Sequence, residues 1–213
     1  MDKAERWLDK TLQYRFRDQG LLARALTHRS AKGRNNERLE FLGDAILDFV
    51  ISEALFRLHP QADEGDLSRL RSALVKDTTL AAIAAELDIG EHLVLGSGER
   101  KTGGHRRQSI LADALEALFG AIYLDGGLDV TRSIIDRIYA ERLGSLPDAD
   151  ELRDPKTRLQ EWLQARKLGL PVYDLVEVTG QDHEQRFSVT CTVSEMSRTT
   201  QGESASRRSA EQQ

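Results

Sequence analysis

The sequence is poor in cysteine and has no long hydrophobic run. Its 213 residues include one cysteine, Cys191, so no disulfide can form within the chain. Cys191 alternates with Phe187, Val189 and Val193, a pattern typical of core packing. No segment reaches the roughly 20 apolar residues that a membrane-spanning helix needs, and the first residues resemble no signal peptide. These absences favour a reducing, cytoplasmic setting without a membrane partner.

The chain also lacks an excess of basic residues. It has 30 lysines and arginines against 35 acidic residues, a net charge of −5. Proteins that bind nucleic acids are often basic because phosphate contacts dominate their affinity. Any such contact here must therefore come from local patches. Clustered carboxylates that bind cations also make a chain acidic, so the charge balance is compatible with a metal site.

Hydrophobic periodicity predicts an all-α domain over residues 1–146, a linker over 147–153 and a small α+β domain over 154–213. The expected helices of the first part cover residues 4–12, 21–27, 36–59, 66–74, 78–87, 109–124 and 128–143. The glycine-rich residues 96–107 are expected to form a flexible basic loop. The second part is predicted to be α-β-β-β-α, and its last helix is expected to be short because the chain stops at Gln213.

Three carboxylates lie on one face of the expected helix 36–59. Glu37, Glu40 and Asp44 are spaced three and four apart, which places them on a common helix face. The other residues of this helix are apolar almost all round, so we expect the helix to be buried. Partly buried, unpaired carboxylates are costly, so a cation, an arginine or a proton must offset the cost.

A second acidic pair, Asp113 and Glu116, lies on one face of another apolar helix. If the two helices face each other, four carboxylates converge, and hard oxygen ligands of this kind suit Mg²⁺ or Mn²⁺. The alternative is that the carboxylates are solvated or paired with Arg38, Arg69 or Arg71. Spacing alone therefore indicates a metal-dependent hydrolase or an acidic metal site.

Five segments resemble, in order and spacing, the ribonuclease III family. The segments are Thr27–Ser30, Asn36–Asp44, Asp63–Ser68, Gly98–Gly104 and Ser109–Glu116. The resemblance implies an all-helical endonuclease domain that acts as a homodimer on double-stranded RNA, with Mg²⁺ and no small-molecule cofactor. The implied reaction leaves 5′-phosphate and 3′-hydroxyl ends. Ribosomal RNA precursors, structured messenger RNA and transfer RNA precursors are the implied substrates.

The same resemblance assigns roles to individual residues. It implies that four carboxylates coordinate metal and that two of these, Asp44 and Glu116, are catalytic. The implied metal ligands are Glu40, Asp44, Asp113 and Glu116. Glu37 and Glu64 match acidic residues near the substrate cleft, and Phe41 matches an aromatic residue at the dimer interface.

The C-terminal part resembles a double-stranded RNA-binding domain. Such domains read the minor groove with little sequence preference. The residues expected to contact RNA lie in the first helix, in the loop between the first two strands and at the start of the last helix. They are Thr157, Gln160, Glu161, His183, Ser206, Arg207 and Arg208. One departure is Ser204, which stands where the family pattern has a glycine.

Two other functions compete with the nuclease interpretation. One is a protein with the same fold that binds double-stranded RNA as a regulator and does not cut it. The presence of all four expected ligands argues against this alternative. The other is an all-α hydrolase of a small phosphate ester, which leaves the C-terminal domain unexplained.

Overall fold

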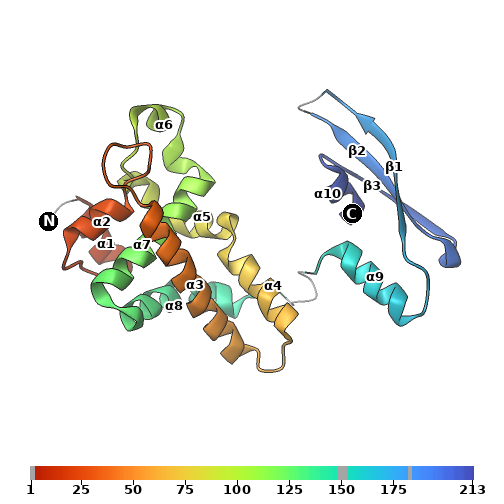
Figure 1. Cartoon of the computed structure of the whole chain (residues 1–213), viewed down its shortest axis with the longest axis horizontal. Helices are drawn as coiled ribbons and strands as arrows, with labels where there is room; N and C mark the ends of the chain where they lie inside the picture. The colour runs from red at the N-terminus through yellow and green to blue at the C-terminus, as the bar shows by residue number, and fades with distance from the viewer. Residues whose placement is uncertain (1–2, 148–152, 182–183) are drawn as a thin grey trace. The chain divides into compact units, whose positions relative to one another are not determined.

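The computed structural model describes residues 3–147, 153–181 and 184–213. These residues form two compact units, Met1–Ala149 and Asp150–Gln213, and each unit is described by itself (Figure 1). The predicted linker over 147–153 lies largely outside the described residues, so its limits stay a prediction. Among the described helices, none combines the length and the apolar character of a membrane-spanning segment.

The first unit is helical, as predicted. Its α-helices are α1 (Lys3–Leu12), α2 (Gln19–Ala25), α3 (Glu37–Leu58), α4 (Glu64–Val75), α5 (Asp77–Glu86), α6 (Ser97–Lys101), α7 (Gln108–Gly126) and α8 (Leu128–Gly144). Two short 3₁₀ helices, η1 (Ile89–His92) and η2 (Gly104–Arg106), join them. Eleven of the 19 residues of α7 are buried, and α3, α5, α8 and α2 pack around it, so α7 is the central helix of this unit.

Two expectations for this unit were wrong. Helix α3 is not buried all round, because Phe41, Phe49 and Phe56 are 78%, 51% and 71% exposed. Their spacing places them on one stripe of the helix, opposite the residues that pack on α7. The stretch 96–107 is not simply a loop, because it contains α6 and η2. Their turn is braced by an ion pair of 2.6 Å between Arg107 and Glu99.

The second unit has the predicted α-β-β-β-α order. Its elements are α9 (Pro155–Ala165), β1 (Val172–Thr179), β2 (Arg186–Val193), η3 (Ser194–Met196), β3 (Arg198–Ser204) and α10 (Arg207–Gln212). The strands form an antiparallel sheet in the order β1-β2-β3. Val189 and Val193 of β2 are buried, and the alternating Phe187 and Cys191 are half-buried, so the predicted inward face is confirmed.

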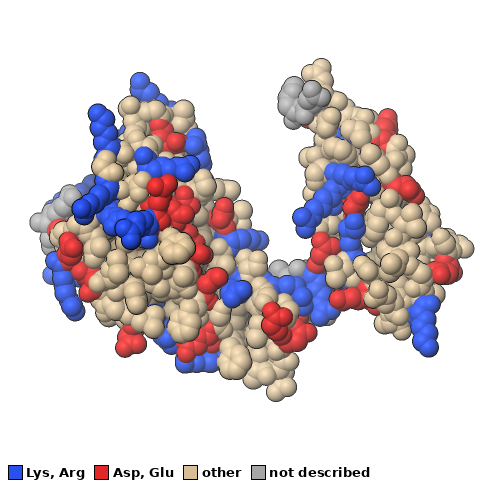
Figure 2. Space-filling view, in the orientation of Figure 1, with Lys and Arg blue, Asp and Glu red and all other residues tan. Residues whose placement is uncertain are grey.

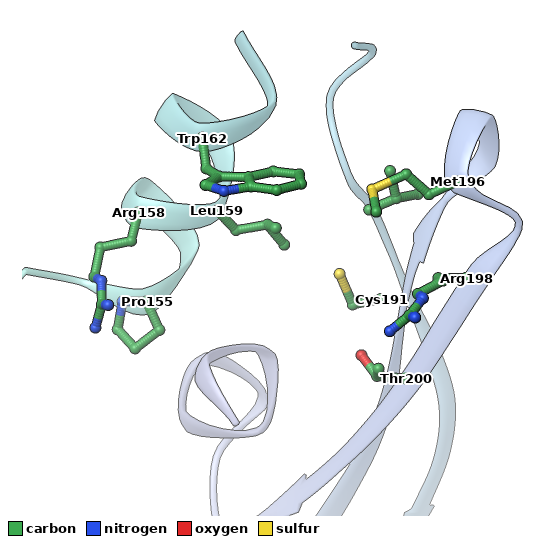
Figure 3. A pocket seen from close by; sticks show the side chains of 9 residues that line it. Pro155, Arg158, Leu159, Trp162, Cys191, Met196, Arg198 and Thr200 are labelled. Atoms are coloured by element: carbon green, nitrogen blue, oxygen red, sulfur yellow. The ribbon is translucent and has the colours of Figure 1, made fainter. Parts of the chain in front are cut away.

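Polar contacts join the start of α9 to the end of α10. The Asp154 side chain caps α9 by accepting from the backbone N–H of Lys156, and it also accepts from Gln212 at 2.6 Å. The Lys156 ammonium pairs with Glu211 at 2.5 Å. Between α9 and the sheet lies a cavity of about 580 Å³, into which Leu159, Trp162 and Cys191 point (Figure 3). The helix–sheet interface of this unit is therefore open at that place.

Candidate metal-binding active site

Helices α3 and α7 bring three carboxylates to one place. One oxygen each of Glu40, Asp113 and Glu116 lies within 4.8 Å of the other two. Glu40 comes from α3, whereas Asp113 and Glu116 lie three residues apart on α7. All three side chains are half-buried. Residues more than 70 positions apart in the sequence thus form a single acidic cluster, which is hereafter the three-carboxylate cluster.

Two glycines allow the helices to approach closely enough to form this cluster. A Cβ atom at Gly43 of α3 would overlap the backbone carbonyl of Glu116. A Cβ atom at Gly120 of α7 would overlap the carbonyl of Leu39 in the same way. The helix backbones therefore touch at the level of the acidic residues, and any larger side chain there would push α3 away from α7.

We expect Gly43→Ala to destabilise the protein and to weaken metal binding. The added methyl group must separate α3 from α7, and overpacking of this kind costs roughly 1–3 kcal/mol. Thermal unfolding would measure the first effect, and titration with Mn²⁺ the second. Gly98→Ala is the control, because nothing lies near a Cβ at Gly98. Equal metal affinity in the two variants would contradict the role given to the helix crossing.

Burial and mutual repulsion make the cluster resist ionisation. Burial raises the pKa of Glu116 to about 8, and the charges of Asp44, Glu40 and Asp113 add to the effect. Burial also raises the pKa of Glu40 and of Asp113, helped by a nearby carboxylate in each case. Carboxyls in such surroundings are stabilised in their ionised form by a cation.

The residue Asp44 lies outside the three-carboxylate cluster. It is exposed on α3, one turn beyond Glu40. Its charge nevertheless contributes to the raised pKa of Glu116, and its own pKa is raised by the partial burial of its carboxyl group and by the charge of Asp48. The predicted convergence of four carboxylates is thus a group of three with a fourth at its border.

Within the described part of the chain, no arginine forms an ion pair with these carboxylates. Among the ion pairs between described residues, none involves Glu40, Asp44, Asp113 or Glu116. Arg69 pairs instead with Asp66, and Arg71 donates to the hydroxyl of Ser52. A half-buried, oxygen-only cluster whose carboxylates make no ion pair among the described residues fits a hard divalent cation.

Two residues near the cluster were missed by the sequence reasoning. Asp77, the first residue of α5, raises the pKa of Asp113 and of Glu116. Arg29, in the segment between α2 and α3, acts against the rise in the pKa of Asp113. Neither residue belongs to a periodic pattern of carboxylates, and only the packing of their segments beside α7 brings them to the site.

The other candidates of this unit are Glu37, Glu64 and Phe41, and none of them belongs to the three-carboxylate cluster. Glu37 is exposed at the start of α3, where it pairs with Arg29 at 3.7 Å. Glu64 is the first residue of α4 and lines a cavity of about 420 Å³ together with Phe49 and Phe56. Phe41 projects into solvent from α3. The space-filling view shows acidic side chains of this unit gathered beside basic ones (Figure 2).

The candidate RNA contacts of the second unit lie on exposed positions of two helices. Thr157, Gln160 and Glu161 are exposed on α9, and Glu161 pairs with Arg153 at 2.9 Å. At the start of α10, Ser206 caps the helix by accepting from the N–H of Ser209. His183 lies outside the described residues.

The two expected arginines of α10 have different surroundings. Arg207 pairs with Glu211 at 2.9 Å, one turn further along the helix. Arg208 is exposed, and its charge helps to lower the pKa of Asp154, although the hydrogen bond from Gln212 contributes more. Both side chains lie at a helix start, where the backbone also favours anions.

Both units match known families. Residues 18–143 match the model of the Ribonuclease-III-like family, and residues 155–213 match the double-stranded RNA binding motif. A relative named Ribonuclease 3 from Alkalilimnicola ehrlichii is 59% identical over 206 residues, which are 97% of this chain and 90% of the relative. Ribonuclease 3 of Pseudomonas paraeruginosa is 57% identical over 205 residues, which are 96% of this chain and 90% of that protein.

Solved structures agree with these matches. The nuclease domain of ribonuclease III from Campylobacter jejuni superimposes with a TM-score of 0.64 at 44% identity, over 68% of this chain and all of that one. A second structure of that domain, with a TM-score of 0.63 at 45% identity over 65% of this chain and 98% of that one, is described as flexible in a region involved in dimer formation. From its two matched units and its identity to these relatives, the chain belongs to the ribonuclease III family.

Proposed function

We propose that this protein is an endonuclease that hydrolyses phosphodiester bonds in double-stranded RNA and depends on Mg²⁺, for which Mn²⁺ can substitute. The observation that carries the proposal is the meeting of Glu40, Asp113 and Glu116 at the crossing of α3 and α7. Membership of the family and the double-stranded RNA binding motif of the second unit support it.

The metal would be held by Glu40, Asp113 and Glu116, with Asp44 at the border of the site. A divalent cation supplies an activated water and neutralises charge that develops at phosphorus. The protein's own part is to hold these carboxylates at a fixed distance from one another, which the glycine-lined crossing of α3 and α7 achieves. We assign the catalytic roles to Glu116, whose pKa burial raises to about 8, and to Asp44.

The roles proposed for Asp44 and Glu116 follow from their surroundings. Asp44 is exposed, so it can meet a substrate phosphate or a water molecule at the surface. The pKa of Glu116 is about 8, so in the absence of a cation this carboxyl group keeps its proton until the pH approaches 8. Glu37 and Glu64, which are exposed near the cluster and on α4, would act on the substrate from outside the metal site.

The second unit would position the duplex. Exposed Thr157, Gln160 and Glu161 of α9 are suited to hydroxyl contacts in a minor groove, and Ser206, Arg207 and Arg208 to phosphates. The proposed contact of His183 completes this set. Because such contacts carry little sequence information, choice among cellular RNAs would come from duplex structure. Precursors of ribosomal and transfer RNA and structured messenger RNA are the proposed substrates.

We also propose a homodimer built on the exposed stripe of α3. Phe41, Phe49 and Phe56 form an apolar surface in which each ring is at least half exposed. Isolated exposed apolar residues are ordinary, but aromatic residues aligned on one helix face indicate an interface. The same face of a second copy would cover them in a twofold-symmetric arrangement.

Incubation of the protein with three nucleic acids tests the proposed activity. We expect cutting of long duplex RNA in the presence of Mg²⁺, and no cutting of single-stranded RNA, duplex DNA or duplex RNA in a chelator. Gel analysis of end-labelled products would show 5′-phosphate and 3′-hydroxyl ends. Duplex RNA that is bound with Mg²⁺ and stays intact would instead support the non-cleaving regulator.

A further inference from the structure

The segment between α2 and α3 carries an arginine, Arg29, whose side chain reaches Glu37 at the start of α3. The flanking residues of Arg29 are fixed from two sides. His28 is buried, its backbone N–H donates to Val94 at 3.0 Å, and its ring Nδ1 lies 2.8 Å from the hydroxyl of Ser30. That hydroxyl also accepts from the N–H of Gly96 at 2.9 Å. The backbone of Arg29 is thus held in place.

In contrast to its backbone, the side chain of Arg29 is 71% exposed and only loosely paired. Its Nη1 lies 3.7 Å from Glu37 Oε1, which is longer than a hydrogen bond. Glu37 is itself held by the side-chain amide of Asn35 at 2.9 Å. An exposed pair of this length adds little to stability. The pair therefore contributes little to holding the fold together, and the guanidinium is free to change partner.

The partner of Arg29 places its positive charge beside the acidic start of α3. Glu37, 3.7 Å from the guanidinium, lies three residues before Glu40 and on the same face of that helix. Glu40 in turn meets Asp113 and Glu116 in the three-carboxylate cluster. A guanidinium that lies beside the acidic end of α3 and makes only a loose pair there can meet an anion that approaches the cluster.

Resting on the proposed function, we propose that Arg29 is a substrate-binding residue whose guanidinium donates to a phosphate oxygen of the RNA strand lying over the three-carboxylate cluster. A phosphate that approaches these carboxylates is repelled by them, and one divalent cation offsets this repulsion only partly. A planar guanidinium with several donors suits a phosphate better than an ammonium does. The phosphate would take the place of Glu37, the present partner of Arg29 at 3.7 Å.

The test compares Arg29→Gln and Arg29→Lys with Arg15→Gln. Arg15 is the matched control, because its side chain is also 71% exposed and paired, with Asp9. At saturating Mg²⁺ we expect Arg29→Gln to lower kcat/KM on duplex RNA by about 10- to 100-fold. The slope of log kcat/KM against log salt should become shallower by about 0.9, the value for one lost phosphate contact. Arg29→Lys should recover part of both effects, and Arg15→Gln should change neither.

A second readout separates this role from a structural one. Loss of the Arg29 guanidinium charge in Arg29→Gln should tighten the binding of Mn²⁺ to the RNA-free protein by about two- to fivefold. A brace of the fold would instead lower the unfolding temperature and leave Mn²⁺ affinity and the salt slope unchanged. Either an unchanged salt slope or unchanged Mn²⁺ affinity in Arg29→Gln overturns the proposal. Failure of the wild-type protein to cut duplex RNA would count against the proposed function, and the Mn²⁺ titration would still decide whether Arg29 acts at the cluster.

Discussion

Glu116→Gln is expected to abolish the cutting of duplex RNA while leaving its binding intact. The substitution keeps the size of the side chain but removes the charge that would hold a cation beside Glu40 and Asp113. Loss of a catalytic metal ligand should lower the cleavage rate by about a thousandfold or more. Binding should persist because the proposed contacts of the second unit are untouched. Single-turnover cleavage assays and filter binding on the same duplex would measure the two effects.

The matched control is Glu141→Gln, the same chemical change on an exposed glutamate of α8. It should cut RNA at the wild-type rate. Cutting by Glu116→Gln within tenfold of wild type would show that Glu116 is not a metal ligand. Loss of both cutting and binding would show instead that the substitution disturbs more than the metal site.

The same variant is expected to change how stability depends on pH in metal-free protein. The pKa of Glu116 is about 8 in the folded state, against an ordinary value of 4.5. The folded state therefore holds this proton more tightly, and the resulting stabilisation is complete below about pH 4.5 and is lost as the pH rises through 8. In Glu116→Gln this loss should be absent. Its unfolding temperature at pH 8 in a chelator should exceed that of wild type by roughly 2–4 °C, and the difference should shrink at pH 5.

The sequence predicts the helical site better than it predicts the site's surroundings. The spacing of Asp113 and Glu116, together with the apolar residues around them, was sufficient to place both on one face of a buried helix. Their meeting with Glu40 required only that two such helices face each other. Local spacing contains no information about Asp77 or Arg29, because the packing of separate segments decides their positions. It also cannot show which side of α3 meets α7.

That last point explains the error about α3. Its apolar residues surround the helix, so periodicity indicated burial on every side. The structure divides them instead: Gly43 and its neighbours lie against α7, whereas Phe41 and Phe49 face solvent. A helix that is apolar all round can be covered on one side by its own chain and on the other by a partner. The two possibilities have the same sequence pattern, and only the tertiary fold distinguishes them.

Phe41→Asp is therefore expected to convert the proposed dimer into monomers. In a twofold-symmetric interface each substitution acts twice, and burial of one phenylalanine side chain contributes roughly 1.5–3 kcal/mol. Loss of two buried rings, about 3–6 kcal/mol, should raise the dissociation constant of the dimer by about 10²- to 10⁴-fold. Sedimentation equilibrium over a range of protein concentrations would measure it. Leu124→Asp is the control, since Leu124 is an exposed apolar residue of α7 that does not belong to the stripe.

The monomer made in this way should still bind metal. Glu40, Asp113 and Glu116 all come from one chain, and the crossing of α3 and α7 that brings them together lies on the other side of α3 from Phe41. Mn²⁺ affinity per chain should therefore equal that of wild type, while cutting of the two strands of a duplex in one encounter should be lost. A Phe41→Asp protein that remains dimeric would place the interface elsewhere. A monomer that no longer binds Mn²⁺ would mean that the metal site is completed across the interface and not within one chain.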